Sequence, residues 1–283
     1  MLSRRWLINY ALVLLIGLFA FLGFKHDDPE ESPQARAIPG LSADLIDSLE
    51  IQTADSRFVL GRKQGDWLIE DPFQWPANRF NVDHLLQITE AKTGSQFPAA
   101  GKDLAEFGLQ HPYALLQLDQ TRITFGISHT IGERRYALID DTVYLLPDVY
   151  YPFIQQGVVA LIDRRLVPPS LQLQSLKLEH STLKRDGDRG WQAVDSQSIS
   201  ADWIAQRISS WQGLEASRVT SLKAAAEPLQ RVEATLQDGT RLDFQVISTQ
   251  PELIIANPAL GLQFHFTEDQ YQQLLAQPDA ASS

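Results

Sequence analysis

Cysteine is absent from this sequence of 283 residues. Without a thiol the chain forms no disulfide bond, binds no metal through sulfur and uses no cysteine nucleophile. Lipid attachment to an N-terminal cysteine is excluded for the same reason. The absence is consistent with an oxidising compartment, where a free thiol is a liability.

Sequence signatures of catalysis are also missing. The chain carries no nucleophile-elbow pattern, no phosphate-binding loop and no dinucleotide fingerprint. No two of its six histidines lie four positions apart in the sequence, the spacing typical of a metal-binding pair on one helix. We therefore predict a non-enzymatic protein with no catalytic residue, no cofactor and no metal ligand. The histidines are His26, His84, His111, His129, His180 and His265.

Two weaker patterns have simple explanations. Asp83 and His84 share one expected helix, where an exposed polar face is a simpler interpretation than a ligand pair. Asp140–Asp141 is more typical of a hairpin turn than of a cation site. An unrecognised hydrolase, built from scattered Asp, Ser and His side chains, is an alternative that would require a close acid–base pair in a pocket.

The N-terminus carries an uncharged, mostly apolar stretch at residues 7–24. As a helix it would extend roughly 27 Å, close to the ~30 Å hydrocarbon core of a bilayer. Arg4 and Arg5 precede the stretch and Lys25 follows it, so the positive-inside rule favours a cytoplasmic N-terminus. A cleaved signal peptide is the alternative, although Gly17–Ala20 matches a cleavage site poorly. We predict a single-pass bacterial inner-membrane protein, held by residues 7–24, with a periplasmic C-terminal domain.

The chain is acidic, with a formal net charge of −11. Such a surface should be repelled by nucleic acid and by anionic lipid head groups, and solubility alone would also explain it. We predict no nucleic-acid partner. The membrane anchor favours a membrane or periplasmic protein as the partner.

A pattern of strands and helices recurs at a spacing of about 120 residues. Ser48–Ile69 and Ser175–Val194 each predict a three-strand meander with a tryptophan on the third strand. A helix then begins at an expected N-cap, Asn81 or Ser200. A short strand, several further strands and a closing helix follow, the closing helices being expected at 148–156 and 268–277.

This order predicts an α+β fold, in which an N-terminal transmembrane helix precedes two tandem repeats of antiparallel β-meander plus helix. The predicted segments are a cytoplasmic stub and anchor at 1–24, a flexible acidic and proline-containing tether at 25–44, a first unit at 45–169, a second unit at 170–278 and a disordered tail at 279–283.

Two segments are candidate partner-contact sites. Phe73 and Trp75 lie in a proline-flanked aromatic loop, which could dock a partner or the membrane surface, or could cover an open edge of the sheet. Asp163, Arg164 and Arg165 form the densest local charge cluster, which could bind a partner or form an ion-paired hinge between the two units. A cleft between the units would instead suit a periplasmic small molecule or glycan.

One further pattern carries a family resemblance. Gly65–Ile69, the segment Asp103–Pro112 with its Phe107-Gly108-Leu109 core, and Leu161–Leu166 together resemble the bacterial domain-of-unknown-function family 4340. The resemblance extends over about residues 45–170, and the second unit lacks the Phe-Gly-Leu element. The family has no established enzymatic activity, so the resemblance assigns no catalytic residues to this chain. The resemblance implies a membrane-anchored exported protein, with an accessory role for an ABC-type transport or cell-envelope complex.

Overall fold

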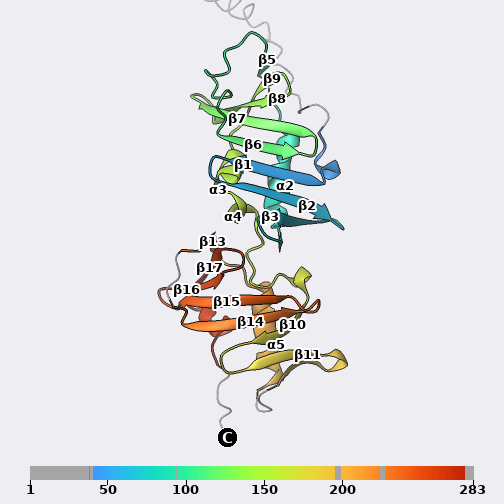
Figure 1. Ribbon diagram of the computed structural model, residues 1–283, viewed down its shortest axis with the longest axis vertical. Helices are drawn as coiled ribbons and strands as arrows, with labels where there is room; N and C mark the ends of the chain where they lie inside the picture. The colour runs from blue at the N-terminus through green and yellow to red at the C-terminus, as the bar shows by residue number, and fades with distance from the viewer. Residues whose placement is uncertain (1–37, 39–40, 94, 195–198, 224–226, 278–283) are drawn as a thin grey trace, which may run out of the picture.

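The computed structural model describes residue 38 and residues 41–93, 95–194, 199–223 and 227–277. Of these residues 44% are in strands and 21% in helices, and the strands form two antiparallel sheets. The two sheets follow one another along the long axis of the molecule (Figure 1). We call the part built on residues 41–162 the first body and the part built on residues 166–277 the second body.

The first sheet has nine strands in the order β4-β3-β2-β1-β6-β7-β8-β9-β5. The strands are β1 (Ser48–Thr53), β2 (Arg57–Lys63), β3 (Asp66–Asp71), β4 (Trp75–Pro76), β5 (Gln96–Pro98), β6 (Ala114–Leu118), β7 (Thr121–His129), β8 (Arg134–Ile139) and β9 (Thr142–Pro147).

The second sheet has eight strands in the order β12-β11-β10-β14-β15-β16-β17-β13. The strands are β10 (Leu173–Lys177), β11 (Thr182–Asp186), β12 (Gly190–Ala193), β13 (Arg218–Ser221), β14 (Gln230–Leu236), β15 (Arg241–Ser248), β16 (Glu252–Asn257) and β17 (Leu262–Thr267).

The two sheets repeat one strand order. In each, a three-strand meander is followed by a four-strand meander, and a short strand from the connection between them pairs with the last strand. The difference is β4, which extends the first sheet beyond β3 and has no counterpart beyond β12.

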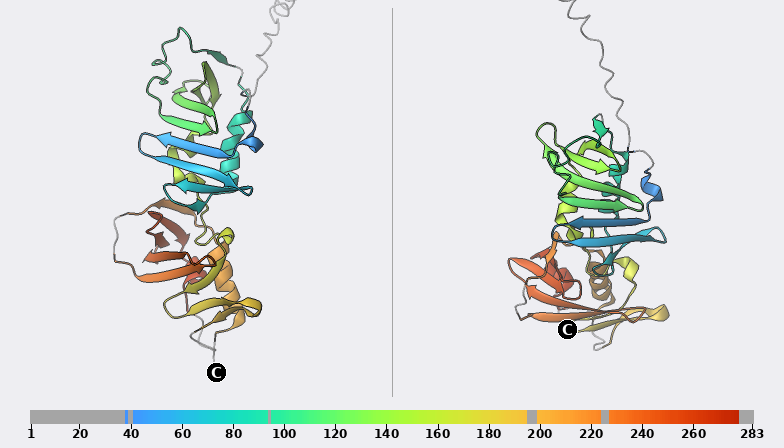
Figure 2. Two further views of the ribbon diagram at one scale, coloured as in Figure 1. Left: turned by 45° about the vertical axis from the view of Figure 1, so that its right-hand side comes forward. Right: turned by 45° about the horizontal axis from the view of Figure 1, so that its top comes forward.

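Short helices cover one face of each sheet (Figure 2). They include α2 (Arg79–Leu86), α3 (Tyr151–Gln156), α4 (Val158–Leu161), α5 (Ala201–Gly213) and α6 (Gln270–Leu274). Single 3-10 turns add η1 (Ala43–Leu45), η2 (Gln87–Glu90), η3 (Pro169–Leu171) and η4 (Gly187–Arg189).

Alternation along the strands creates the core beneath these helices. In β1 the side chains of Leu49 and Ile51 are fully buried while Ser48 and Gln52 are exposed, as expected for a sheet with one covered face. In the second body the fully buried Trp211 of α5 packs edge-on against Phe244, with ring centroids 5.4 Å apart. Its indole N–H donates to the carbonyl of Leu274, 2.9 Å away, and so ties α5 to α6.

The α+β assignment is wrong, because the structure of the described residues is mostly β. The closing helices expected at 148–156 and 268–277 are shorter in the structure, as α3 and α6, and α5, the longest helix of the described residues, has only 13 residues. The helices therefore serve as covers for two large sheets and do not form a comparable layer. Among the described residues no helix is long and apolar enough to cross a membrane, and the predicted span at 7–24 lies outside them.

Of the two predicted helix caps, Ser200 is confirmed, since its hydroxyl accepts from the amide of Trp203 at 3.2 Å. The other is wrong by one turn. The N-cap of α2 is Asn78, and Asn81 is the residue whose amide donates to it at 3.1 Å. Both Asn residues suit a cap, so the residue type alone does not distinguish them.

Candidate functional site

The two bodies meet at a junction of three short main-chain segments, which are β4, residues 161–165 and the residues just before β13. Residues 161–165 run along the edge of β4, where the amide of Asp163 donates to the carbonyl of Pro76 at 2.9 Å. The same segment continues to the second body, where the carbonyl of Arg164 accepts from Ala216 at 2.9 Å. One segment therefore pairs with both bodies and fixes the distance between them.

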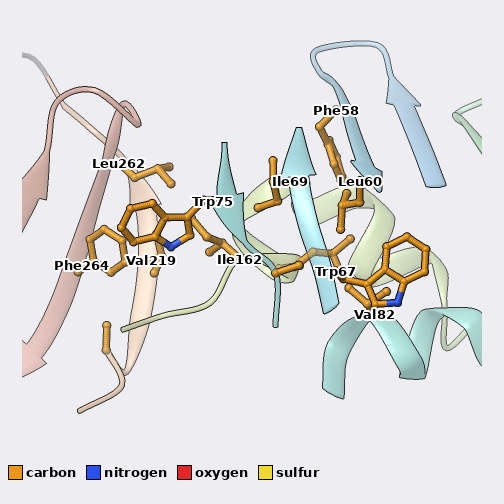
Figure 3. Packing of buried hydrophobic residues seen from close by; sticks show 14 of the residues in the cluster. Phe58, Leu60, Trp67, Ile69, Trp75, Val82, Ile162, Val219, Leu262 and Phe264 are labelled. Carbon is orange, nitrogen blue, oxygen red and sulfur yellow. The ribbon is translucent and has the colours of Figure 1, made fainter. Parts of the chain in front are cut away.

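Trp75 fills the space inside this junction. Its side chain is 3% exposed, and its indole N–H donates to the carbonyl of Asp163 at 3.2 Å. Figure 3 shows the ring among Ile162 of the connecting segment and three side chains of the second body, Val219, Leu262 and Phe264. Trp75 is thus a residue of the first sheet whose neighbours belong largely to the second.

A charge cluster lies beside the tryptophan. Arg165 is 3.5 Å from both Asp163 and Glu215, and Arg164 is 3.1 Å from Glu215. Burial raises the pKa of Asp163, and a hydrogen bond from the Arg165 amide opposes that shift. Because the arginines and Glu215 are each about one third exposed, we expect their ion pairs to align the bodies more than to stabilise them.

The five predicted partner-contact residues have different environments. Trp75, Asp163, Arg164 and Arg165 come together in the junction, whereas Phe73 packs half-buried against the core of the first body. Glu215 completes the charge cluster and was not predicted, because nothing in its local sequence relates it to a segment about fifty residues earlier.

A second cluster surrounds His265 on β17, which is 4% exposed. Its Nδ1 lies 3.1 Å from a carboxylate oxygen of Glu252 and 3.0 Å from Arg218, and its Nε2 lies 3.0 Å from the hydroxyl of Thr220. Carboxylate, imidazole and hydroxyl in this order resemble a hydrolytic triad. None of these residues lines any of the three hollows described below, and Glu252 and Arg218 lie at the surface, with side chains 42% and 55% exposed.

The Glu252 carboxylate links folding to pH. Hydrogen bonds from His265 and then from Arg218 hold the pKa of Glu252 below its ordinary value of 4.5. A carboxylate whose pKa is lowered by folding stabilises the protein at any pH above its pKa in the unfolded state. This stabilisation is lost as the pH falls through its pKa in the folded state. We therefore expect Glu252→Gln to lower the urea midpoint at pH 7, with the difference from the unmodified chain shrinking below about pH 4.5. A difference that is unchanged at pH 3 would contradict this role. Glu106→Gln, at an exposed position of a loop, should change little at either pH.

Three hollows lined by described residues each lie within one body. The largest of these three, about 550 Å³, is lined by charged residues of the second sheet, including Lys177, Arg231 and Asp243. A hollow of about 440 Å³ in the first body contains the pair Arg135–Asp148, whose closest atoms are 2.7 Å apart. The third, of about 210 Å³, lies between η1 and α2. None of the three extends across the junction, which is filled by Trp75 and its neighbours.

The Phe-Gly-Leu element has a defined structural role. Residues 99–113 form a strap over the outer face of β7 and β8, where the carbonyl of Phe107 accepts from the amide of Ile127 at 2.9 Å. Phe107 packs between Phe97 and Tyr136, at centroid distances of 5.2 and 4.9 Å. The strap can approach β7 this closely because Gly126 has no side chain.

Among the described residues no group of three or more His, Asp or Glu side chains is arranged to hold a metal ion. The junction connects the two sheets mechanically, and the His265 cluster connects β13, β16 and β17 through one buried imidazole and two exposed charged side chains.

Comparison with known proteins identifies a family but no function. No curated protein matches the chain, and no solved structure matches it. A family model described as a domain of unknown function, DUF4340, matches residues 67–246. The match begins in β3 and ends in β15, so it includes much of the second body and is not confined to the predicted 45–170. The chain belongs to the DUF4340 family.

Proposed function

We propose that this protein is a non-enzymatic accessory or scaffold component of an ABC-type transport complex or another cell-envelope complex. In this proposal residues 7–24 hold the chain in the inner membrane and the two bodies stand in the periplasm. A scaffold has to present surfaces at fixed positions, and the feature that supports this role best is the junction around Trp75.

Three properties of the junction favour a fixed arrangement. Main-chain hydrogen bonds join the connecting segment to both bodies, Trp75 is almost completely buried, and a cluster of ion pairs lies beside it. Flexible interdomain contacts are usually more polar and more open than this. The filled junction also leaves little support for a ligand cleft between the bodies, and the buried position of His265 leaves little for a hydrolase.

Affinity purification after crosslinking in native membranes tests the proposal. We expect the tagged full-length chain to recover a membrane or periplasmic protein in near-stoichiometric amount. A tagged chain containing only residues 1–37 serves as the control, and it should recover none, because the partner would bind the bodies. Recovery of the full-length chain alone would contradict the scaffold role.

A reporter fused after Ser283 tests the location separately. The proposal predicts reporter activity on the periplasmic side of the membrane. Cytoplasmic activity of the same fusion would overturn the predicted topology, whatever the purification shows.

A further inference from the structure

Among the strands that the structure describes, one position of the repeated strand order is filled in the first sheet and has no counterpart in the second. β3 and β12 are the third strands of equivalent meanders, and each carries a tryptophan, Trp67 or Trp191. In the first sheet β4 pairs with β3 at Leu68 and Ile69. In the second sheet β12 is an edge strand, with no further strand beside it among the described residues. Trp191 is only half-buried, whereas Trp67 is 3% exposed.

The other three sheet edges are each protected. Pro76 interrupts β4, and its carbonyl already accepts from Asp163. Pro98 interrupts β5. The start of β13 is covered by Arg164, whose side chain donates to the carbonyl of Ser217 at 3.3 Å. Prolines, charges and covering segments are the usual means of preventing edge pairing. The segment Gly190–Val194 contains neither a proline nor a charged residue.

The hydrogen-bonding groups on the outer edge of β12 can be identified from its pairing with β11. The amide of Val194 donates to the carbonyl of Thr182 at 2.8 Å, so Val194 faces β11. Main-chain groups alternate in direction along an antiparallel strand. Gln192 therefore also faces β11, while the N–H and C=O groups of Trp191 and Ala193 point away from the sheet. Within the described part of the chain neither residue has a main-chain partner on that side.

We propose that β12 is an interface at which the second sheet pairs with the β12 of a second copy of this chain. The two strands would run antiparallel about a two-fold axis at Gln192, which is an isologous arrangement. Trp191 would then lie opposite Ala193 of the partner subunit, and each pair would exchange both of its main-chain hydrogen bonds. Gln192 would face Gln192 of the partner subunit as a non-hydrogen-bonded pair.

The properties of β12 fit a second copy as its occupant. The strand is uncharged, so two copies can meet there without like-charge repulsion even though each chain carries a net charge of −11. A large side chain, Trp191, meets a small one, Ala193, on the face that α5 covers, where both are half-buried. The partner strand would occupy the position that β4, with its own tryptophan, occupies beside β3.

A single cysteine tests the pairing, because the chain has none of its own. Opposed residues of a non-hydrogen-bonded pair have Cα atoms about 4.5 Å apart, which a disulfide can bridge. We expect the purified full-length Gln192→Cys chain to form a covalent dimer on mild oxidation at least ten times faster than Gln96→Cys. Gln96 is the matched control, an exposed glutamine on the edge strand β5.

A second substitution tests the register. Ala193→Pro removes an outward N–H and leaves the hydrogen bonds between β11 and β12 in place. Added to Gln192→Cys, it should slow crosslinking at least tenfold, with the urea midpoint reporting that the fold is retained. Equal crosslinking rates for Gln192→Cys and Gln96→Cys would overturn the proposal. So would a monomeric unmodified chain at all concentrations in analytical ultracentrifugation.

Discussion

Trp75→Ala is expected to destabilise the protein by about 3–5 kcal/mol, the range for removing a buried tryptophan. The loss should fall on the contact between the two bodies, because the indole packs against Val219, Leu262 and Phe264 and donates to the carbonyl of Asp163. We expect the unmodified chain to unfold in one urea transition and the Trp75→Ala variant to unfold in two, one for each body. Circular dichroism and tryptophan fluorescence would record the transitions.

Trp67→Ala is the matched control for this prediction. Trp67 is as buried as Trp75, at 3% exposure, but it lies on β3 within the first body and Arg62 stacks over its ring at 4.9 Å. Trp67→Ala should lower the stability of the first body by a similar amount without changing the contacts that residues 161–165 make with the two bodies. If both variants give identical unfolding profiles, Trp75 has no special role in coupling.

Gly126→Ala is the second substitution with a large expected effect. A Cβ at this position would lie 2.0 Å from the carbonyl oxygen of Phe107, which is main chain and already accepts the Ile127 amide. The strap has to move away from β7, and this disturbs the stacking of Phe107 on Tyr136. We expect destabilisation of about 3 kcal/mol, the upper part of the usual range for overpacking. The urea midpoint would measure it.

Gly213→Ala controls for the general effect of replacing glycine. Gly213 ends α5, and a Cβ there would have no neighbour within 4 Å. Alanine reduces the conformational freedom of the unfolded chain, so this variant should be neutral or more stable by about 0.5–1 kcal/mol. A loss of less than 1 kcal/mol for Gly126→Ala would mean that the strap is not fixed by its contact with β7.

Local features of the fold could be predicted from the sequence because their causes are local. Alternating apolar residues predict β1 and β2, and an N-cap serine predicts the start of α5. The extent of the helices could not be predicted in this way. Residues 148–156 have helical spacing, but residues 148–150 form a turn, so α3 begins only at Tyr151 and ends as expected before Gly157, whose φ is 72°. The α+β assignment is wrong because the helices are shorter than the spacing of their apolar residues suggests.

The junction depends on contacts between distant parts of the chain. The aromatic loop at Trp75 is compatible with an exposed docking site or with a buried contact, and the choice depends on β13 and β17, which follow more than 140 residues later. The His265 cluster has the same origin, since Glu252, Arg218 and His265 meet through strand pairing alone. No spacing rule within one segment reveals either site.

The central claim is that the two bodies are held in one arrangement. The absence of cysteine allows two spin labels to be placed specifically, at Gln52 on β1 and Lys184 on β11, both exposed. Pulsed dipolar spectroscopy of this doubly labelled chain would measure the distribution of distances between the bodies. We predict one narrow distribution for the otherwise unmodified chain and a clearly broader one after Trp75→Ala. A broad distribution in the chain that retains Trp75 would contradict the account.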